Sequence, residues 1–184
     1  MFIQTEATPN PASMKFLPGR DVMDQGVADF TEQDTAQAGS PLASRLFAVD
    51  GVAGVYLGQN FITVTKTETE DWQRLKPAVL GAIMEHYLSG DPVVHAHALA
   101  DEAGSEDEDQ IVTQIRELID TRVRPAVAQD GGDIVFHGFE RGVVYLHMRG
   151  ACAGCPSSVV TLKNGIENLL RYYVPEVVEV RAVS

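Results

Sequence analysis

Cys152 and Cys155 are the residues of this chain whose type and spacing most directly predict chemistry. They are its only cysteines, and two small residues, Ala153 and Gly154, separate them. Two thiolates at this spacing can bind one soft metal ion or one iron–sulfur cluster, but such centres usually take four protein ligands. The sequence therefore predicts that other residue types, or a second copy of the chain, complete the site.

The two cysteines lie in a loop that we expect between a strand and a helix. Pro156 directly follows Cys155 and suits the first helical position, where a missing N–H costs nothing. The free amides and the dipole of that first turn favour anionic sulfur, which lowers a thiol pKa. On spacing alone, three interpretations stay open: metal or cluster binding, thiol–disulfide chemistry, and inert thiols.

Histidines offer one way to complete a site within a single chain. His137 and His147 lie on two strands that we expect to pair just before the cysteine loop, so a Cys₂His₂ zinc site is an alternative. The plainer interpretation of each is a half-exposed strand residue without a metal. His95 and His97 lie in a predicted linker, where we expect solvated side chains.

The elements that must position the cysteines span residues 110–184. An apolar stripe predicts a helix that starts at Gln110, and Pro125 is expected to kink or end it. The glycines of 129–133 predict a turn. Two hairpin strands, a helix and a last strand follow, at 134–139, 143–148, 156–172 and 177–183. This order predicts helices on one face of a small mixed sheet.

Residues 1–92 predict a separate small unit without an obvious reactive group. Ser40 and Pro41 predict a helix start, with the serine as N-cap and the proline at the first helical position. Gly58-Gln59 indicates a hairpin. The remaining expected elements are strands at 2–8, 13–17, 52–57 and 60–66 and a helix at 72–88.

Residues 93–109 show no apolar face, and their acidic end predicts an extended linker. The predicted fold class is therefore α+β, with two small α/β-layer domains, residues 1–92 and 110–184, joined by an acidic flexible linker. The formal net charge of −12 repels phosphate backbones, so nucleic acid is not an expected partner. No apolar run could span a bilayer, and no basic, apolar leader is visible, which predicts a reducing bacterial cytosol and no membrane partner.

Four stretches, at 8–19, 129–133, 146–158 and 161–167, resemble the Nfu family of iron–sulfur proteins. The first stretch is similar to the Nfu N-terminal domain, and the other three to the C-terminal domain of NifU. The resemblance implies that Cys152 and Cys155 bind a cluster, usually [4Fe–4S] and alternatively [2Fe–2S], which two protomers share. It also implies a homodimer in the cluster-bound form, an upstream cluster-assembly donor, delivery to apo-protein clients, and no enzymatic activity.

The ligand count agrees with that implication, because two chains related by a two-fold axis provide four thiolates. Two rivals stay open beside it. One is a thiol–disulfide oxidoreductase that uses Cys152 and Cys155. The other is a zinc-stabilised interaction module that depends on His137 or His147. For residues 1–92 we expect a docking role, with passive stabilisation as the alternative.

Overall fold

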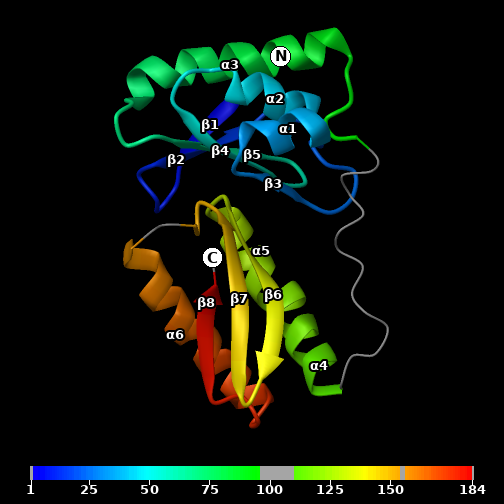
Figure 1. Cartoon of the computed structure of the whole chain (residues 1–184), viewed down its shortest axis with the longest axis vertical. Coiled ribbons are helices and arrows are strands. Elements are labelled where there is room, and N and C mark those ends of the chain that lie inside the picture. The colour runs from blue at the N-terminus through cyan, green and yellow to red at the C-terminus, as the bar shows by residue number, and fades with distance from the viewer. Residues whose placement is uncertain (1, 96–109, 154–155, 184) are drawn as a thin grey trace. The chain divides into compact units, whose positions relative to one another are not determined.

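The computed structural model describes residues 2–95, 110–153 and 156–183. The chain divides into two compact units, Met1–Ala103 and Gly104–Ser184, and each has its own hydrophobic core (Figure 1). Both units combine helices with a sheet, which confirms the predicted α+β class. Among the described residues, no helix combines the length and the apolar character that a bilayer span requires.

An antiparallel sheet of five strands forms one layer of the N-terminal unit, in the order β1-β2-β5-β4-β3. The strands are β1 (Gln4–Ala7), β2 (Ser13–Leu17), β3 (Ala28–Phe30), β4 (Val52–Leu57) and β5 (Ile62–Lys66). The helices α1 (Gln33–Gly39), α2 (Pro41–Phe47) and α3 (Trp72–Ser89) lie on one side of this sheet (Figure 1). β2 and β4 have the predicted bounds, whereas β3 and α1 were not predicted from the sequence.

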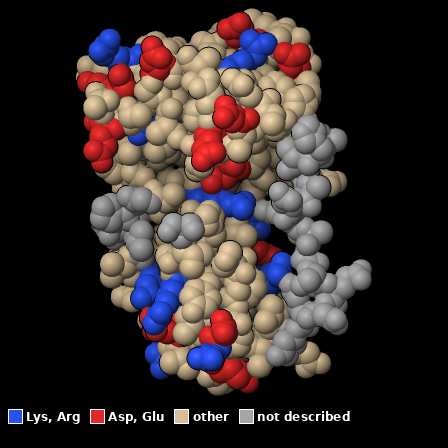
Figure 2. Space-filling view, in the orientation of Figure 1, with Lys and Arg blue, Asp and Glu red and all other residues tan. Residues whose placement is uncertain are grey.

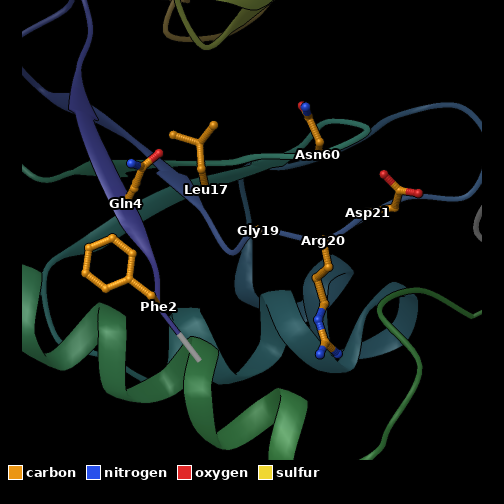
Figure 3. A pocket seen from close by; sticks show the side chains of 7 residues that line it. All are labelled: Phe2, Gln4, Leu17, Gly19, Arg20, Asp21 and Asn60. Atoms are coloured by element: carbon orange, nitrogen blue, oxygen red, sulfur yellow. The ribbon is translucent and has the colours of Figure 1, made fainter.

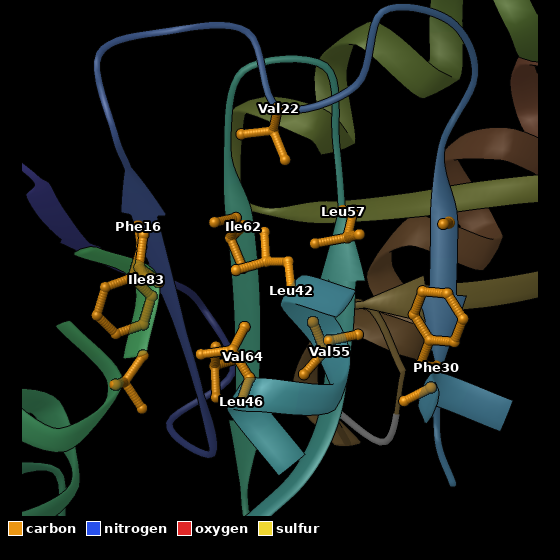
Figure 4. Packing of buried hydrophobic residues seen from close by; sticks show 14 of the residues in the cluster. Phe16, Val22, Phe30, Leu42, Leu46, Val55, Leu57, Ile62, Val64 and Ile83 are labelled. Atoms are coloured by element: carbon orange, nitrogen blue, oxygen red, sulfur yellow. The ribbon is translucent and has the colours of Figure 1, made fainter. Parts of the chain in front are cut away.

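The core of the N-terminal unit lies between this sheet and its helices. Apolar side chains from both layers point toward one another in Figure 4 and have no exposed surface, namely Phe16, Ile62 and Val64 from the sheet and Leu42, Leu46 and Ile83 from the helices. Burying each such side chain contributes about 1.5–3 kcal/mol. This packing forms the hydrophobic core of the N-terminal unit.

Local signals set the ends of the helices in this unit. The Ser40 hydroxyl accepts a hydrogen bond from the Ala43 N–H at 3.0 Å, and Pro41 occupies the first turn, so the predicted start of α2 is confirmed. Gly90 ends α3 with φ = 76°, a left-handed conformation that favours glycine.

The first residues of the predicted linker contact the N-terminal unit. The Ser40 hydroxyl donates a hydrogen bond to the Val93 carbonyl, and the His95 N–H donates one to the Gly39 carbonyl at 2.8 Å. The rest of that predicted linker, residues 96–109, lies outside the described residues. The exact domain limits therefore stay a prediction.

The C-terminal unit packs helices on one face of a three-stranded sheet (Figure 1). β6 pairs antiparallel with β7, and β7 pairs parallel with β8, which gives the predicted mixed sheet. The strands are β6 (Gly132–Glu140), β7 (Val143–Gly150) and β8 (Glu179–Val183), and the helices are α4 (Gln110–Leu118), α5 (Arg124–Gln129) and α6 (Pro156–Tyr173). The wholly buried side chains Ile115, Leu146 and Leu170 join the two layers.

Pro125 neither ends the first helix of this unit nor leaves it regular. A π-helical turn, Ile119–Val123, precedes the proline, and α5 then runs on to Gln129. The wider turn suits the sequence because Pro125 lacks an N–H to donate to the preceding turn. The result is a helix that reaches the turn beside the cysteine loop.

Candidate functional site

Cys152 lies in a tight turn between the end of β7 and the start of α6, at the strand-to-helix junction that the sequence predicted. Its side chain is buried, with 5% of its surface exposed, and packs with the apolar core of the C-terminal unit. Cys155, the second predicted ligand, lies outside the described residues, as does Gly154. The structure therefore describes one half of the predicted cysteine pair.

Backbone hydrogen bonds fold the chain tightly around Cys152. The Cys152 N–H donates to the Arg149 carbonyl at 3.3 Å, and the Ala153 N–H donates to the Gly150 carbonyl at 3.1 Å. Gly150 adopts φ = 61°, which lets β7 turn sharply at this point. A third bond, from the Ala151 N–H to the Gly131 carbonyl at 3.2 Å, ties the cysteine turn to the turn that precedes β6.

That preceding turn brings Gly132 into contact with the thiol. Gly131 has φ = 75°, and the sheet register then places Gly132 opposite Gly150. A Cβ atom at position 132 would lie 2.2 Å from Cys152 Sγ and 2.9 Å from the Cys152 backbone nitrogen. Only a glycine leaves room for Cys152 in this position, since the backbone nitrogen cannot move aside as a flexible side chain can.

A charge pair holds the same turn to the helix before it. Arg124 of α5 donates two hydrogen bonds to the Asp133 carboxylate, each 2.9 Å long, and a further one to Asp120 at 3.3 Å. The Asp133 side chain is 3% exposed, and its Oδ1 also accepts from the Ile134 N–H at 2.9 Å. Burial opposes the charge on Arg124, but the bonds to Asp133 outweigh it and raise the pKa of the guanidinium. Asp133 thus has a structural role, whereas the sequence indicated only a turn.

The histidines of the zinc alternative lie on the paired strands, as expected. His147 lies opposite Val135, and His137 occupies the bulge where the register of β6 shifts. Burial first, and then the positive charges of Arg149 and His137, lower the pKa of His147. Within the described part of the chain, no group of three or more Cys, His, Asp or Glu side chains could hold a metal ion.

A separate hollow of about 370 Å³ opens on the N-terminal unit, and Figure 3 shows its lining. The lining residues come from β1 and the segment before it, from the end of β2 and the loop after it, and from the β4–β5 turn: Phe2, Gln4, Leu17, Gly19, Arg20, Asp21 and Asn60. Arg20 also stacks on the Tyr87 ring, with its guanidinium carbon 4.9 Å from the ring centre. The lining lacks cysteine and histidine, so this hollow provides shape and hydrogen bonding but no nucleophile of those types.

Family profiles match both units. The profile described as "Scaffold protein Nfu/NifU N terminal" matches residues 3–90, and the one described as "NifU-like domain" matches residues 115–181. The chain belongs to the Nfu/NifU scaffold family. This confirms the resemblance that the sequence motifs indicated.

Relatives along the whole length agree with this assignment. A protein of Drosophila erecta and one of Homo sapiens, both named "NFU1 iron-sulfur cluster scaffold homolog, mitochondrial", are 54% and 50% identical to this Nfu-family chain over 185 and 184 residues. The alignments cover 100% of this chain, but 65% of the fly protein and 72% of the human one. The chain thus spans about two thirds of the length of these relatives.

Solved structures match the family chain less closely. A solution structure of a NifU-like protein from Saccharomyces cerevisiae has a TM-score of 0.47 at 22% identity and covers 52% of this chain and 86% of its own. A crystal structure of protein SAV1430 from Staphylococcus aureus has a TM-score of 0.40 at 24% identity and covers 45% of this chain and 99% of its own.

The names of the relatives correct one prediction. The animal proteins are named mitochondrial, so the expectation of a bacterial cytosolic protein is wrong. The sequence features behind that expectation can favour a reducing compartment over an oxidising one, but they do not distinguish one reducing compartment from another. The sequences of the folded domains contain little information about the cellular compartment.

Proposed function

We propose that this chain carries an iron–sulfur cluster on Cys152 and Cys155 and transfers it to apo-proteins. The observation that carries the proposal is the position of Cys152 at a strand-to-helix junction within a NifU-like domain. The relatives are named iron–sulfur cluster scaffolds, which supports the same cargo here. A mitochondrial location, which those names also print, is the corresponding proposal for the compartment.

The cargo is a [4Fe–4S] cluster that two protomers share. One chain offers two thiolates, and no set of other side chains in the described residues supplies the missing ligands. Two chains offer four thiolates, which is the usual complement of such a cluster. A [2Fe–2S] cluster takes the same four ligands, and the iron count per dimer tells the two apart.

We expect cluster transfer to proceed by ligand exchange, because the cluster is held by thiolates from two separate protomers. A client thiolate bonds to an iron atom as one scaffold thiolate leaves it, so the number of sulfur ligands and the oxidation state of the cluster stay unchanged. After four such exchanges the cluster belongs to the client, and the four protons that the client thiols lost protonate the four released scaffold thiolates. The chain provides ligands and no catalytic residue, and a cluster-assembly donor must load it beforehand.

The match to a NifU-like domain and the names of the relatives favour this proposal over the thiol–disulfide rival. The zinc rival depends on His137 or His147. We expect the double variant His137→Ala/His147→Ala to keep its full cluster content.

A transfer experiment tests the proposal. The chain is loaded anaerobically with ⁵⁷Fe and sulfide and mixed with an apo-ferredoxin that needs four cysteines, in the presence of an iron chelator. We expect the labelled cluster to reach the ferredoxin faster than the chelator removes it. Equal transfer from free iron and sulfide, or from the Cys152→Ser variant, would refute a carrier role.

The N-terminal unit is proposed to dock clients, with the hollow beside β1 as its contact surface. Arg20, Asn60 and the exposed Phe2 offer a cation, an amide and an aromatic ring there. The Phe2→Ala/Asn60→Ala variant should slow transfer to a client while its cluster content stays unchanged. An unchanged transfer rate would leave this unit a stabilising module.

A further inference from the structure

The position of the Cys152 thiol conflicts with a cluster that two chains share. Cys152 Sγ rests on the Gly132 backbone, at the place where any Cβ would be 2.2 Å away, and 5% of the residue is exposed. A sulfur atom that bonds to a centre held by a second chain must lie at the surface of its own chain. The described conformation is therefore a closed one, in which Cys152 is seated inside the C-terminal unit.

The contacts around the thiol show what keeps it closed. The Ala151 N–H donates to the Gly131 carbonyl, so the cysteine turn cannot leave without breaking a bond to the turn before β6. That turn is fixed in its place by Asp133, which accepts two hydrogen bonds from Arg124 and a third from the Ile134 N–H. Gly132 lies between these two restraints and provides the empty space that the sulfur fills.

We propose that Gly132 is the seat of the Cys152 thiol in the cluster-free chain, and that the Arg124–Asp133 pair holds this seat. Loading a cluster lifts Cys152 off Gly132 and breaks the Ala151–Gly131 bond. Gly132 and Arg124 are then positioning residues that set how accessible the thiol is, without touching the cluster themselves. This inference rests on the proposed function for the meaning of the open state, but the seat itself exists without a cluster.

The first test measures access to the thiol in the full chain without metal. A Cys155→Ser variant leaves Cys152 as the one thiol, and its alkylation by iodoacetamide is followed by mass spectrometry. Because a seated thiol reacts only through transient opening, we expect folded protein to react at least about tenfold more slowly than the same protein in concentrated urea. Rates within twofold of each other would overturn the seat.

A matched pair of glycine variants then tests the contact itself. Gly132→Ala places a methyl group on the sulfur, whereas Gly138→Ala, on the same strand, meets nothing within 4 Å. We expect Gly132→Ala to speed alkylation of Cys152 by about tenfold and Gly138→Ala to leave it within twofold, since only the first removes the closed state. Equal rates in the two variants would refute the role of Gly132.

A second variant keeps the inference testable if Gly132→Ala does not fold. Arg124→Lys keeps the positive charge but loses the paired hydrogen bonds to Asp133. We expect it to speed alkylation a few-fold while the circular dichroism of the chain stays unchanged. A rate equal to that of the parent would show that the Arg124–Asp133 pair does not hold the seat.

Hydrogen exchange on loading separates this inference from the proposed function. In the loaded dimer the amide of Ala151 should exchange faster than in the cluster-free chain, because its bond to Gly131 is lost. If the chain binds no cluster but its Cys152 thiol is protected, the proposed function is refuted and the inference about the seat still holds. If the loaded dimer forms but the exchange rate of the Ala151 amide is unchanged, the opening is refuted and the proposed function still holds.

Discussion

The two units of this chain differ in charge and in the way they are held together. Residues 1–95 contain six Lys and Arg against twelve Asp and Glu, whereas residues 110–184 contain eight of each. Figure 2 accordingly shows acidic side chains spread over the N-terminal unit and both signs intermixed on the C-terminal unit. The neutral unit contains both cysteines, so the strong acidity of the chain belongs to the part without them.

The two units also differ in the contacts that stabilise them. The N-terminal unit buries side chains from five strands and three helices in one apolar core. The C-terminal unit has a sheet of three strands. Near Cys152, its structure depends on the buried Asp133 carboxylate and on two glycines with positive φ, Gly131 and Gly150. We infer that the first unit is a fixed body and that the second keeps a few local bonds that can break without unfolding its core.

The largest expected effect concerns the cysteines and should be confined to the second unit. Cys152→Ser removes one of the two thiolates that each chain contributes, so we expect the loss of essentially all reconstituted iron and acid-labile sulfide. The matched control is Ile83→Ala in the first unit, which should keep its cluster under native conditions. Full cluster content in Cys152→Ser would break the contrast between the units.

The next effect concerns the core of the first unit. Ile83 is wholly buried on α3, and Ile83→Ala should lower the free energy of unfolding by about 2–5 kcal/mol, through lost burial and a cavity. Met84 is 41% exposed, so Met84→Ala is the control and should change little. Trp72 is the only tryptophan of the chain and lies in this unit, so its fluorescence in urea reports the unit alone.

A smaller effect is expected from the charge pair beside the thiol. Arg124→Gln leaves the Asp133 carboxylate buried without its cation, which should cost about 2–4 kcal/mol because Arg124 itself is partly exposed. Hydrogen exchange of β6 and β7 peptides measures the loss, and the Trp72 transition should not move. Arg171→Gln, which loses a long 3.8 Å contact between the exposed Arg171 guanidinium and Glu167, is the control and should change stability by less than about 0.5 kcal/mol.

The smallest effect is a pH dependence in the first unit. His86 is buried on α3, and burial first, then the charge of Arg45, lower its pKa, while Asp91 acts in the opposite direction. The unfolded chain therefore binds a proton more readily than the folded one, so the free energy of unfolding should fall as the pH drops below about 6.5. The Trp72 transition should show this fall, and His86→Leu should abolish it. A parent transition as stable at acidic as at neutral pH would contradict it.

Strong local signals made much of the fold predictable. Ser40 before Pro41 and Gly58 between two apolar runs act on their immediate neighbours, so the sequence shows them directly. β3 has three residues, and α1 is built from polar and small ones, so neither has a periodic apolar pattern to find. The π-helical turn before Pro125 was missed for a different reason, because its buried residues Ile119 and Val123 continue the apolar stripe of the preceding helix.

The site was less predictable than the fold because its key contacts are distant in the sequence. The two cysteines were visible from their spacing, and the position of Cys152 after a strand was predicted. The contact of Gly132 with Cys152, however, depends on the register that places Gly132 opposite Gly150. The pair of Arg124 with Asp133 likewise needs a helix to run through the π-helical turn. Tertiary register of this kind has no local signature.

The central claim, one cluster shared by two copies of the chain, is tested most directly by native mass spectrometry after anaerobic reconstitution with iron and sulfide. The account predicts a dimer that is heavier than two chains by one [4Fe–4S] unit, and a monomer without metal for Cys152→Ser. A monomer that contains zinc, or one that contains a Cys152–Cys155 disulfide and no iron, would contradict the account.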